Sequence, residues 1–233
     1  MSAPLAVIVG AGAGLSASLA RALATDGYAL TLAARDTAKL EDLAAQTGAA
    51  TQALDARDPA AMAALFDGLA AAPRVAVYNP SARVRGGIAE LDPEEVRRAV
   101  ETTAFGAFLM GQAAARRMLA AEPDANGVRG TILFTGASAG VKGFPNSATF
   151  AMGKFAQRGL AQSMARELHP KGIHVAWINI DGAIRNPGRT EPPDAPDSML
   201  DPDAIARSYL HLIGQDRSAW SDELTLRPWV ERF

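Results

Sequence analysis

The amino-acid sequence predicts an α/β fold: a Rossmann-like, doubly wound parallel sheet of about seven strands with helices on both faces. Short apolar runs alternate with segments of helical length along the whole chain, as in sheets built from strand–helix–strand units. A glycine-rich turn follows the first apolar run, where such folds begin a helix. With 233 residues, 48% of them hydrophobic, the chain can form one domain over residues 1–233.

The expected strands are the apolar runs themselves. Five of them are Leu5–Val9, Ala29–Ala34, Arg74–Asn79, Thr131–Thr135 and Ile173–Ile180. A further strand is expected just before Asp55, and a last one in the C-terminal stretch "ELTLRPWVERF". Because helical segments separate these runs, the strands are expected to lie parallel.

Aspartate–proline pairs mark the start of three helices, at Asp58, Asp92 and Asp201. The aspartate can cap the first turn, and the proline that follows lacks only an amide hydrogen that the first turn does not use. The longest helices are expected at about Pro93–Ala121 and Asn146–Leu168, buried on more than one face. The proline-rich stretch Arg185–Pro202 is expected to be a long loop.

The composition excludes several classes of function. With 23 basic and 25 acidic residues the chain shows no basic excess, so nucleic acid is not an expected partner. There is no cysteine, and the three histidines do not have a metal-ligand spacing, so neither a disulfide nor a metal site is expected. No apolar run is long enough to span a membrane, which leads us to expect a cytoplasmic protein.

The first glycine turn, "VIVGAGAGLSASLARAL", predicts a site for a phosphate group. A strand leads into glycines and then into a helix, so backbone amides at the helix start can approach an anion closely. One common glycine pattern would need glycine at Leu15 and another would need it at Ser16. The alternative interpretation is a tight turn that binds no ligand.

Arg35 follows the second strand, where the adenosine ribose of a dinucleotide would lie. An arginine there suits a 2′-phosphate, so the sequence favours NADP(H) over NAD(H). Asp36 comes next and is either a ribose acceptor or a helix cap. Asp55 is likewise either a contact to the adenine amino group or a turn residue.

In the order of these landmarks the chain resembles the classical-type short-chain dehydrogenase/reductase family over nearly its whole length. Gly10, Gly14 and Leu15 are similar to the family's glycine pattern, and Asp55 matches its aspartate after the third strand. The stretch "YNPSA" keeps Asn79 of the family's asparagine–alanine–glycine turn, and "FAMGK" supplies the lysine, Lys154, of its Y-x-x-x-K motif.

The resemblance also implies an atypical active site. The family's catalytic tyrosine would stand at Phe150, its serine at Ala137 and its asparagine at Thr103, which leaves Lys154. Ser138 lies one residue beyond the expected serine and could replace it, so Lys154 and Ser138 are the candidate catalytic residues. In the family's variant with tyrosine seven residues before lysine, the matching residue is Ser147. Other substitute donors are Thr149, Tyr78 and Asp181, each with an alternative structural role.

The family's nicotinamide contacts would fall after the sixth strand, at Asp181-Gly182 and Ala183-Ile184, followed by residues 185–202 as a lid over the substrate. The residues expected to bind the cofactor are Gly10, Gly12, Ala13, Gly14, Leu15, Arg35, Asp55, Ala56, Asn79, Lys154, Gly182 and Ile184.

Two functions of different class are compatible with these residues. The first is an NADP(H)-dependent oxidoreductase with a non-standard proton donor, acting on a small-molecule substrate. The second is a catalytically degenerate NADP(H)-binding sensor or regulatory protein. Phenylalanine has no ionisable hydrogen, but positioning of the reactants contributes more to catalysis than a general acid does, so we favour the enzyme. The resemblance further implies a homo-oligomer.

Overall fold

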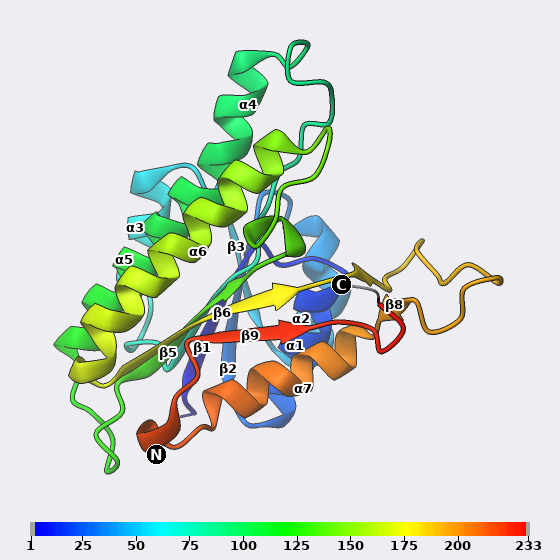
Figure 1. Ribbon diagram of the computed structural model, residues 1–233. Helices are drawn as coiled ribbons and strands as arrows, with labels where there is room; N and C mark the ends of the chain where they lie inside the picture. The colour runs from blue at the N-terminus through cyan, green and yellow to red at the C-terminus, as the bar shows by residue number, and fades with distance from the viewer. Residues whose placement is uncertain (1–2, 232–233) are drawn as a thin grey trace.

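Seven parallel strands form the central sheet of the computed structural model, which describes residues 3–231 (Figure 1). Their order across the sheet is β3-β2-β1-β4-β5-β6-β9. The strands are β1 (Leu5–Val9), β2 (Ala29–Ala34), β3 (Ala50–Ala53), β4 (Val75–Tyr78), β5 (Gly130–Thr135), β6 (Ile173–Ile180) and β9 (Glu223–Leu226). The predicted doubly wound α/β fold is therefore confirmed.

The strand order reverses beside β1, which pairs with β2 on one side and with β4 on the other. The chain first builds outward through β2 to β3 and then returns to β4, β5 and β6. All carboxyl ends lie at one edge because every pair in this sheet is parallel. In sheets of this kind the ligand site lies at that edge, where the order reverses.

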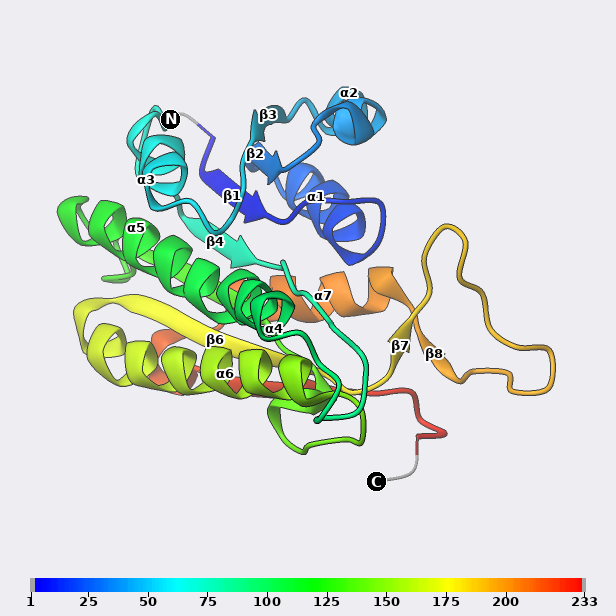
Figure 2. The same ribbon diagram turned by 90° about the horizontal axis from the view of Figure 1, so that it is seen from above.

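Helices cover both faces of the sheet, as Figure 2 shows from above. One face carries α1 (Leu15–Thr25), α2 (Glu41–Thr47) and α7 (Pro202–Ile213). The other carries α3 (Pro59–Asp67), α4 (Pro93–Val100), α5 (Gly106–Ala120) and α6 (Ala148–Leu168). Each face has its own cluster of buried hydrophobic side chains, as expected for a sheet buried on both sides.

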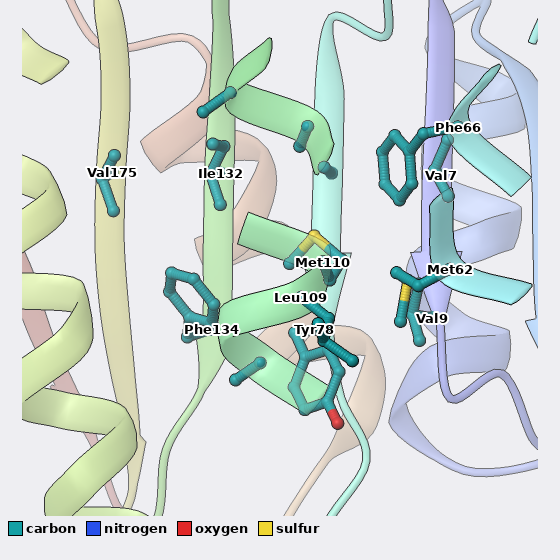
Figure 3. Close-up of a cluster of buried hydrophobic side chains, with 14 of the residues drawn as sticks. Val7, Val9, Met62, Phe66, Tyr78, Leu109, Met110, Ile132, Phe134 and Val175 are labelled. Atoms are coloured by element: carbon teal, nitrogen blue, oxygen red, sulfur yellow. The ribbon is translucent and has the colours of Figure 1, made fainter. Parts of the chain in front are cut away.

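Figure 3 shows the cluster between the sheet and the second group of helices. Val7 and Val9 of β1 and Phe134 of β5 point toward the helices, and Phe66 of α3 and Met110 of α5 pack against the sheet. All five side chains are at most 1% exposed. This packing fixes α3 and α5 over the strands whose ends form the ligand edge.

The three predicted aspartate caps are confirmed. The carboxylates of Asp58, Asp92 and Asp201 each accept a hydrogen bond of 2.8–3.1 Å from backbone amides two or three residues further on. A proline follows each aspartate at the first helical position. Short-range chemistry is thus enough to start α3, α4 and α7.

The expected helix Pro93–Ala121 is not one regular helix. Residues Glu101–Phe105 form a π-helix between α4 and α5. The wide turn brings the carbonyl of Thr102 within 2.5 Å of the Tyr78 hydroxyl, which donates to it. Immediately beyond, a Cβ on Gly106 would lie only 2.2 Å from the same hydroxyl. The helix passes so closely over the end of β4 that a regular side chain cannot stand at Gly106.

The stretch 185–202 is not wholly a loop. It contains strand β8 (Met199–Leu200), which pairs in parallel with β7 (Ala183–Ile184), and its last residue, Pro202, begins α7. Between these two short strands the chain extends away from the body of the protein (Figure 2). The strand pair therefore fixes both ends of this excursion at the ligand edge.

Gly10 has a backbone φ of 82°, and a Cβ at this position would lie 2.6 Å from the Pro80 ring. Gly27 has a similar φ of 86° with open space around it. We expect Gly10→Ala and Gly27→Ala each to lose about 1–2 kcal/mol of unfolding free energy from the left-handed backbone, and Gly10→Ala to lose more because Pro80 must move. Urea unfolding of both variants checks this, and equal losses would contradict the predicted crowding.

Candidate functional site

A cleft of about 880 Å³ opens at the carboxyl edge of the sheet. Its walls come from the residues that follow or end four strands: Gly14 after β1, Asn79 after β4, Thr135 at the end of β5 and Ile180 at the end of β6. Lys154 and Phe150 of α6 complete it. The cleft therefore lies at the edge where the strand order reverses.

The glycine turn after β1 is braced by side chains. The hydroxyl of Ser16 donates to the Gly10 carbonyl at 3.0 Å, and the amide of Asn79 donates to that hydroxyl at 2.7 Å. Ser16, which departs from the common glycine pattern, thus links the turn to the end of β4. Asn79 lines the cleft, but its side-chain amide is turned toward the glycine turn.

The start of α1 is open to a ligand. No side chain caps the first turn of this helix, and a Cβ on Gly12 would meet nothing within 4 Å. Ala13 is exposed, and Gly14 and Leu15 line the cleft. Uncapped amides at a helix start, with free space before them, match the requirements of a diphosphate.

Arg35 and Asp55 lie on the neighbouring strand ends, after β2 and β3. Arg57 holds the Asp55 carboxylate at 2.6 Å, and this hydrogen bond is the main reason why the pKa of Asp55 is lowered. Arg35 is exposed, and within residues 3–231 its guanidinium has no hydrogen bond or ion pair. Ala56 is buried beside this pair. Asp36 accepts the amide of Ala38 and forms an ion pair with Lys39.

Lys154 is buried beneath the cleft, with 2% of its surface exposed. Its ammonium donates to the Thr135 carbonyl at 2.5 Å and to the Gln157 side-chain oxygen at 3.2 Å. Burial, reinforced by the charge of Arg83, lowers the pKa of Lys154 to about 7. The side chain can therefore gain or lose a proton near neutral pH.

Gln157 connects this lysine to two other elements. Its amide donates to the Thr103 carbonyl of the π-helix at 3.3 Å, and its oxygen also accepts from the Trp177 indole at 3.3 Å. The Thr103 hydroxyl accepts the Ala82 amide at 3.1 Å and is thus engaged with the chain after β4. The sequence analysis did not single out Gln157, although a polar residue three positions after a buried helical lysine was a usable signal.

Phe150 forms one wall of the cleft and is 5% exposed. The Arg83 guanidinium lies over its ring, 3.7 Å from the ring centre. Ala137 and Ser138 face the same cleft from the loop after β5. That loop is pressed onto Trp177, because a Cβ on Gly136 or Gly140 would lie within 2.5 Å of the indole.

The family model for short chain dehydrogenases matches residues 4–189. The chain belongs to the short-chain dehydrogenase family. The crystal structure of a short-chain dehydrogenase from Rhodopseudomonas palustris is similar over 97% of this chain and 99% of that one, with 33% identity and a TM-score of 0.80.

Two further matches broaden the comparison. L-2,3-butanediol dehydrogenase of Corynebacterium glutamicum is 29% identical over 73% of this chain and 68% of that protein. A metagenomic short-chain oxidoreductase, solved in complex with NADP, is 27% identical, with a TM-score of 0.82 over 99% of both chains. The match with the solved structures thus extends over nearly the whole of this short-chain dehydrogenase.

The sequence offered four substitute proton donors. Three of them already form a hydrogen bond or an ion pair within the protein. The Thr149 hydroxyl donates to the Val84 carbonyl, Tyr78 donates to the π-helix, and Asp181 forms an ion pair with Arg227. Ser138 faces the cleft, and within the described chain its hydroxyl has no hydrogen bond.

The segment after β6 completes the cleft. Gly182, Ala183 and Ile184 line the cleft, and the side chain of Asn186 lies beside Gly14. Residues 3–231 contain no cluster of metal-ligating side chains. In the same range, no helix combines the length and apolar character needed to cross a membrane.

The pKa of Lys154 makes stability depend on pH. It is about 7 in the folded protein and about 10.4 in an unfolded chain, so between these values the unfolded state binds more protons. The free energy of unfolding of the wild type should therefore rise as the pH is raised from 7.5 to 9. Its slope should exceed the slope of the Lys154→Met variant by about 1.4 kcal/mol per pH unit. Denaturant titrations of the protein without cofactor measure this slope. The exposed Lys142→Met is the control, and equal slopes in the wild type and Lys154→Met would refute the assignment.

Proposed function

We propose that this short-chain dehydrogenase is an NADP(H)-dependent oxidoreductase in which Phe150 replaces the family's catalytic tyrosine. The observation that carries the proposal is the position of Lys154. Its buried ammonium lies beneath one continuous cleft that also includes the uncapped start of α1 and the Gly182–Ile184 segment. A cleft with phosphate-binding amides at one wall and a titratable cation beneath it suits a bound dinucleotide and its reaction partner.

The residues present fit this cofactor. The glycine turn from Gly10 to Leu15 would hold the diphosphate, and Arg35 would hold the 2′-phosphate. Lys154 would donate to the nicotinamide ribose, and the backbone at Ile184 would contact the nicotinamide. When bound, NADPH supplies a hydride.

The proton that carbonyl reduction also needs must come from the protein's own side chains. Phe150 cannot donate one, but it excludes water from the cleft wall that it forms. We propose that the free Ser138 hydroxyl donates a hydrogen bond to the substrate carbonyl oxygen and that Lys154 supplies positive charge and a proton from below. A pKa near the operating pH is the value that suits a general acid.

We further propose that residues 185–202 act as the lid over the substrate. Asn186 and Arg189 of this segment already line the cleft, and the β7–β8 pair fixes its two ends. The length between these ends leaves the segment room to cover a ligand of variable shape.

Cofactor choice tests the assignment of Arg35. We expect Arg35→Gln to raise the Kd for NADPH about 10- to 100-fold, because a hydrogen-bonded charge pair with the 2′-phosphate is lost, while the Kd for NADH stays the same. Arg166→Gln, which removes an exposed cation in the last turn of α6, outside the cleft, should change neither. Fluorescence titrations measure both constants. If the wild type binds neither nucleotide, the proposed function is wrong.

The proton donor is tested by two variants in single-turnover NADPH oxidation with a panel of small aldehydes, ketones and 2-oxo acids. We expect Ser138→Ala to slow hydride transfer about 10- to 100-fold without changing NADPH affinity, since one donor to the oxygen is lost. Phe150→Tyr should raise the rate if only the acid is missing. If Ser138→Ala leaves the rate of hydride transfer unchanged, Ser138 is not the donor to the substrate oxygen. If the wild type and every variant bind NADPH but turn over no substrate, the alternative function, an NADP(H)-binding sensor protein, is favoured.

A further inference from the structure

The charges around the cleft all have one sign. Three arginines, Arg83, Arg85 and Arg189, line it together with Lys154, and within residues 3–231 no aspartate or glutamate lines it. The whole chain has 25 acidic and 23 basic residues, so its composition does not lead one to expect this separation. A cleft lined by cations alone concentrates anions.

The three arginines of this group, which we call the arginine rim, have no anionic partner. Within residues 3–231 their side chains form neither a hydrogen bond nor an ion pair, and the Arg83 guanidinium stacks on the Phe150 ring. Several arginines outside the cleft do have an acidic partner, as Arg158 has in Glu223 and Arg74 has in Asp124. Burial first, and then the charges of Arg85 and Arg189, lower the pKa of Arg83, so the Arg83 guanidinium lies within electrostatic reach of the other two.

The rim is held in place by backbone contacts. Arg83 and Arg85 flank Val84, whose amide and carbonyl are both bonded to the Thr149 hydroxyl of α6, at 3.2 and 2.8 Å. Arg189 sits in a turn closed by two backbone hydrogen bonds with Asn186. These cations are thus held at one cleft although, in the part of the chain that the structure describes, none of the three guanidinium groups is in an ion pair. Like charges held this way are stabilised by a ligand of opposite charge.

Resting on the proposed function, we propose that the arginine rim binds an oxyanion of the substrate, so that this enzyme acts on carbonyl compounds that carry a carboxylate or phosphate group. In the proposed function the cofactor's own phosphates would have other partners, at the start of α1 and at Arg35. The rim lies beside Phe150, at the part of the cleft where the reacting carbonyl would be.

This placement gives the rim two effects. A guanidinium binds a carboxylate through two parallel hydrogen bonds, which fixes the direction of the bound group as well as its position. A neighbouring carbonyl would then face Ser138 and Lys154, which line the same cleft. The same positive charges stabilise negative charge that develops on the carbonyl oxygen.

The test uses three probes of similar shape: benzoylformate, its neutral methyl ester and benzoylphosphonate. Calorimetry measures their binding to the protein loaded with NADP⁺, which cannot reduce them. We expect benzoylformate or benzoylphosphonate to bind about 10- to 100-fold more tightly than the ester. The anion that binds more tightly of the two indicates whether the substrate carries a carboxylate or a phosphate group.

Arg83→Gln/Arg85→Gln should remove this preference and leave the affinities for the ester and for NADP⁺ unchanged. Arg207→Gln, which removes an equally exposed arginine on α7 outside the cleft, should change nothing. Arg83→Lys keeps the charge without the fork and should keep part of the preference. Near-ultraviolet circular dichroism of each variant verifies the fold.

Equal binding of the ester and the two anions would overturn the proposal. So would a loss of NADP⁺ affinity as large as the loss of anion affinity, because the rim would then serve the cofactor. If the wild type binds no nucleotide, the proposed function fails by itself, and the same titrations on the free protein still decide whether the rim selects anions.

Discussion

The buried ammonium of Lys154 constrains the structure around the cleft more than any other group. A cation in the interior needs acceptors within reach, and here they are the Thr135 carbonyl and the Gln157 side chain. Gln157 in turn is satisfied by the Trp177 indole and the Thr103 carbonyl. The register of α6 on β5 and β6 and the position of the π-helix are therefore determined together, since moving any one of them would leave a buried polar group unpaired.

This arrangement changes what the cleft can do chemically. Phe150 offers no proton, yet its ring supports the Arg83 guanidinium, and Lys154 has a pKa near 7 beneath it. Positive charge on two sides favours an oxygen that becomes negative as a hydride arrives, whether or not a strong acid is present. General acids contribute about 10²–10⁴-fold in typical enzymes, so an electrostatic site can retain much of the rate without a tyrosine.

Local chemistry made part of this structure predictable. The strand Leu5–Val9 and the cap Asp92 depend on residues within a few positions of each other, and both are where the sequence placed them. The π-helix was not predictable, because it depends on a hydroxyl from β4 that meets Thr102 only after folding. Arg83 likewise belongs to a loop whose sequence shows no function; only the tertiary fold places it over Phe150. Both features depend on contacts between segments that are distant in the sequence, and the spacing of apolar residues carries no information about such contacts.

The same distinction bears on the cofactor. In the sequence, Asp36 competes with Arg35 as the residue at the ribose, where a carboxylate would repel a 2′-phosphate, and Asp55 is a second carboxylate, after the next strand. In the structure each carboxylate is already paired, Asp36 with Lys39 and Asp55 with Arg57. Within residues 3–231 the Arg35 guanidinium forms no hydrogen bond or ion pair, because each of these carboxylates has another cation as its direct partner. A guanidinium at the end of β2 that is not held in an ion pair attracts a dianionic phosphate more strongly than a neutral hydroxyl, and this difference in charge supports the proposed preference for NADP(H).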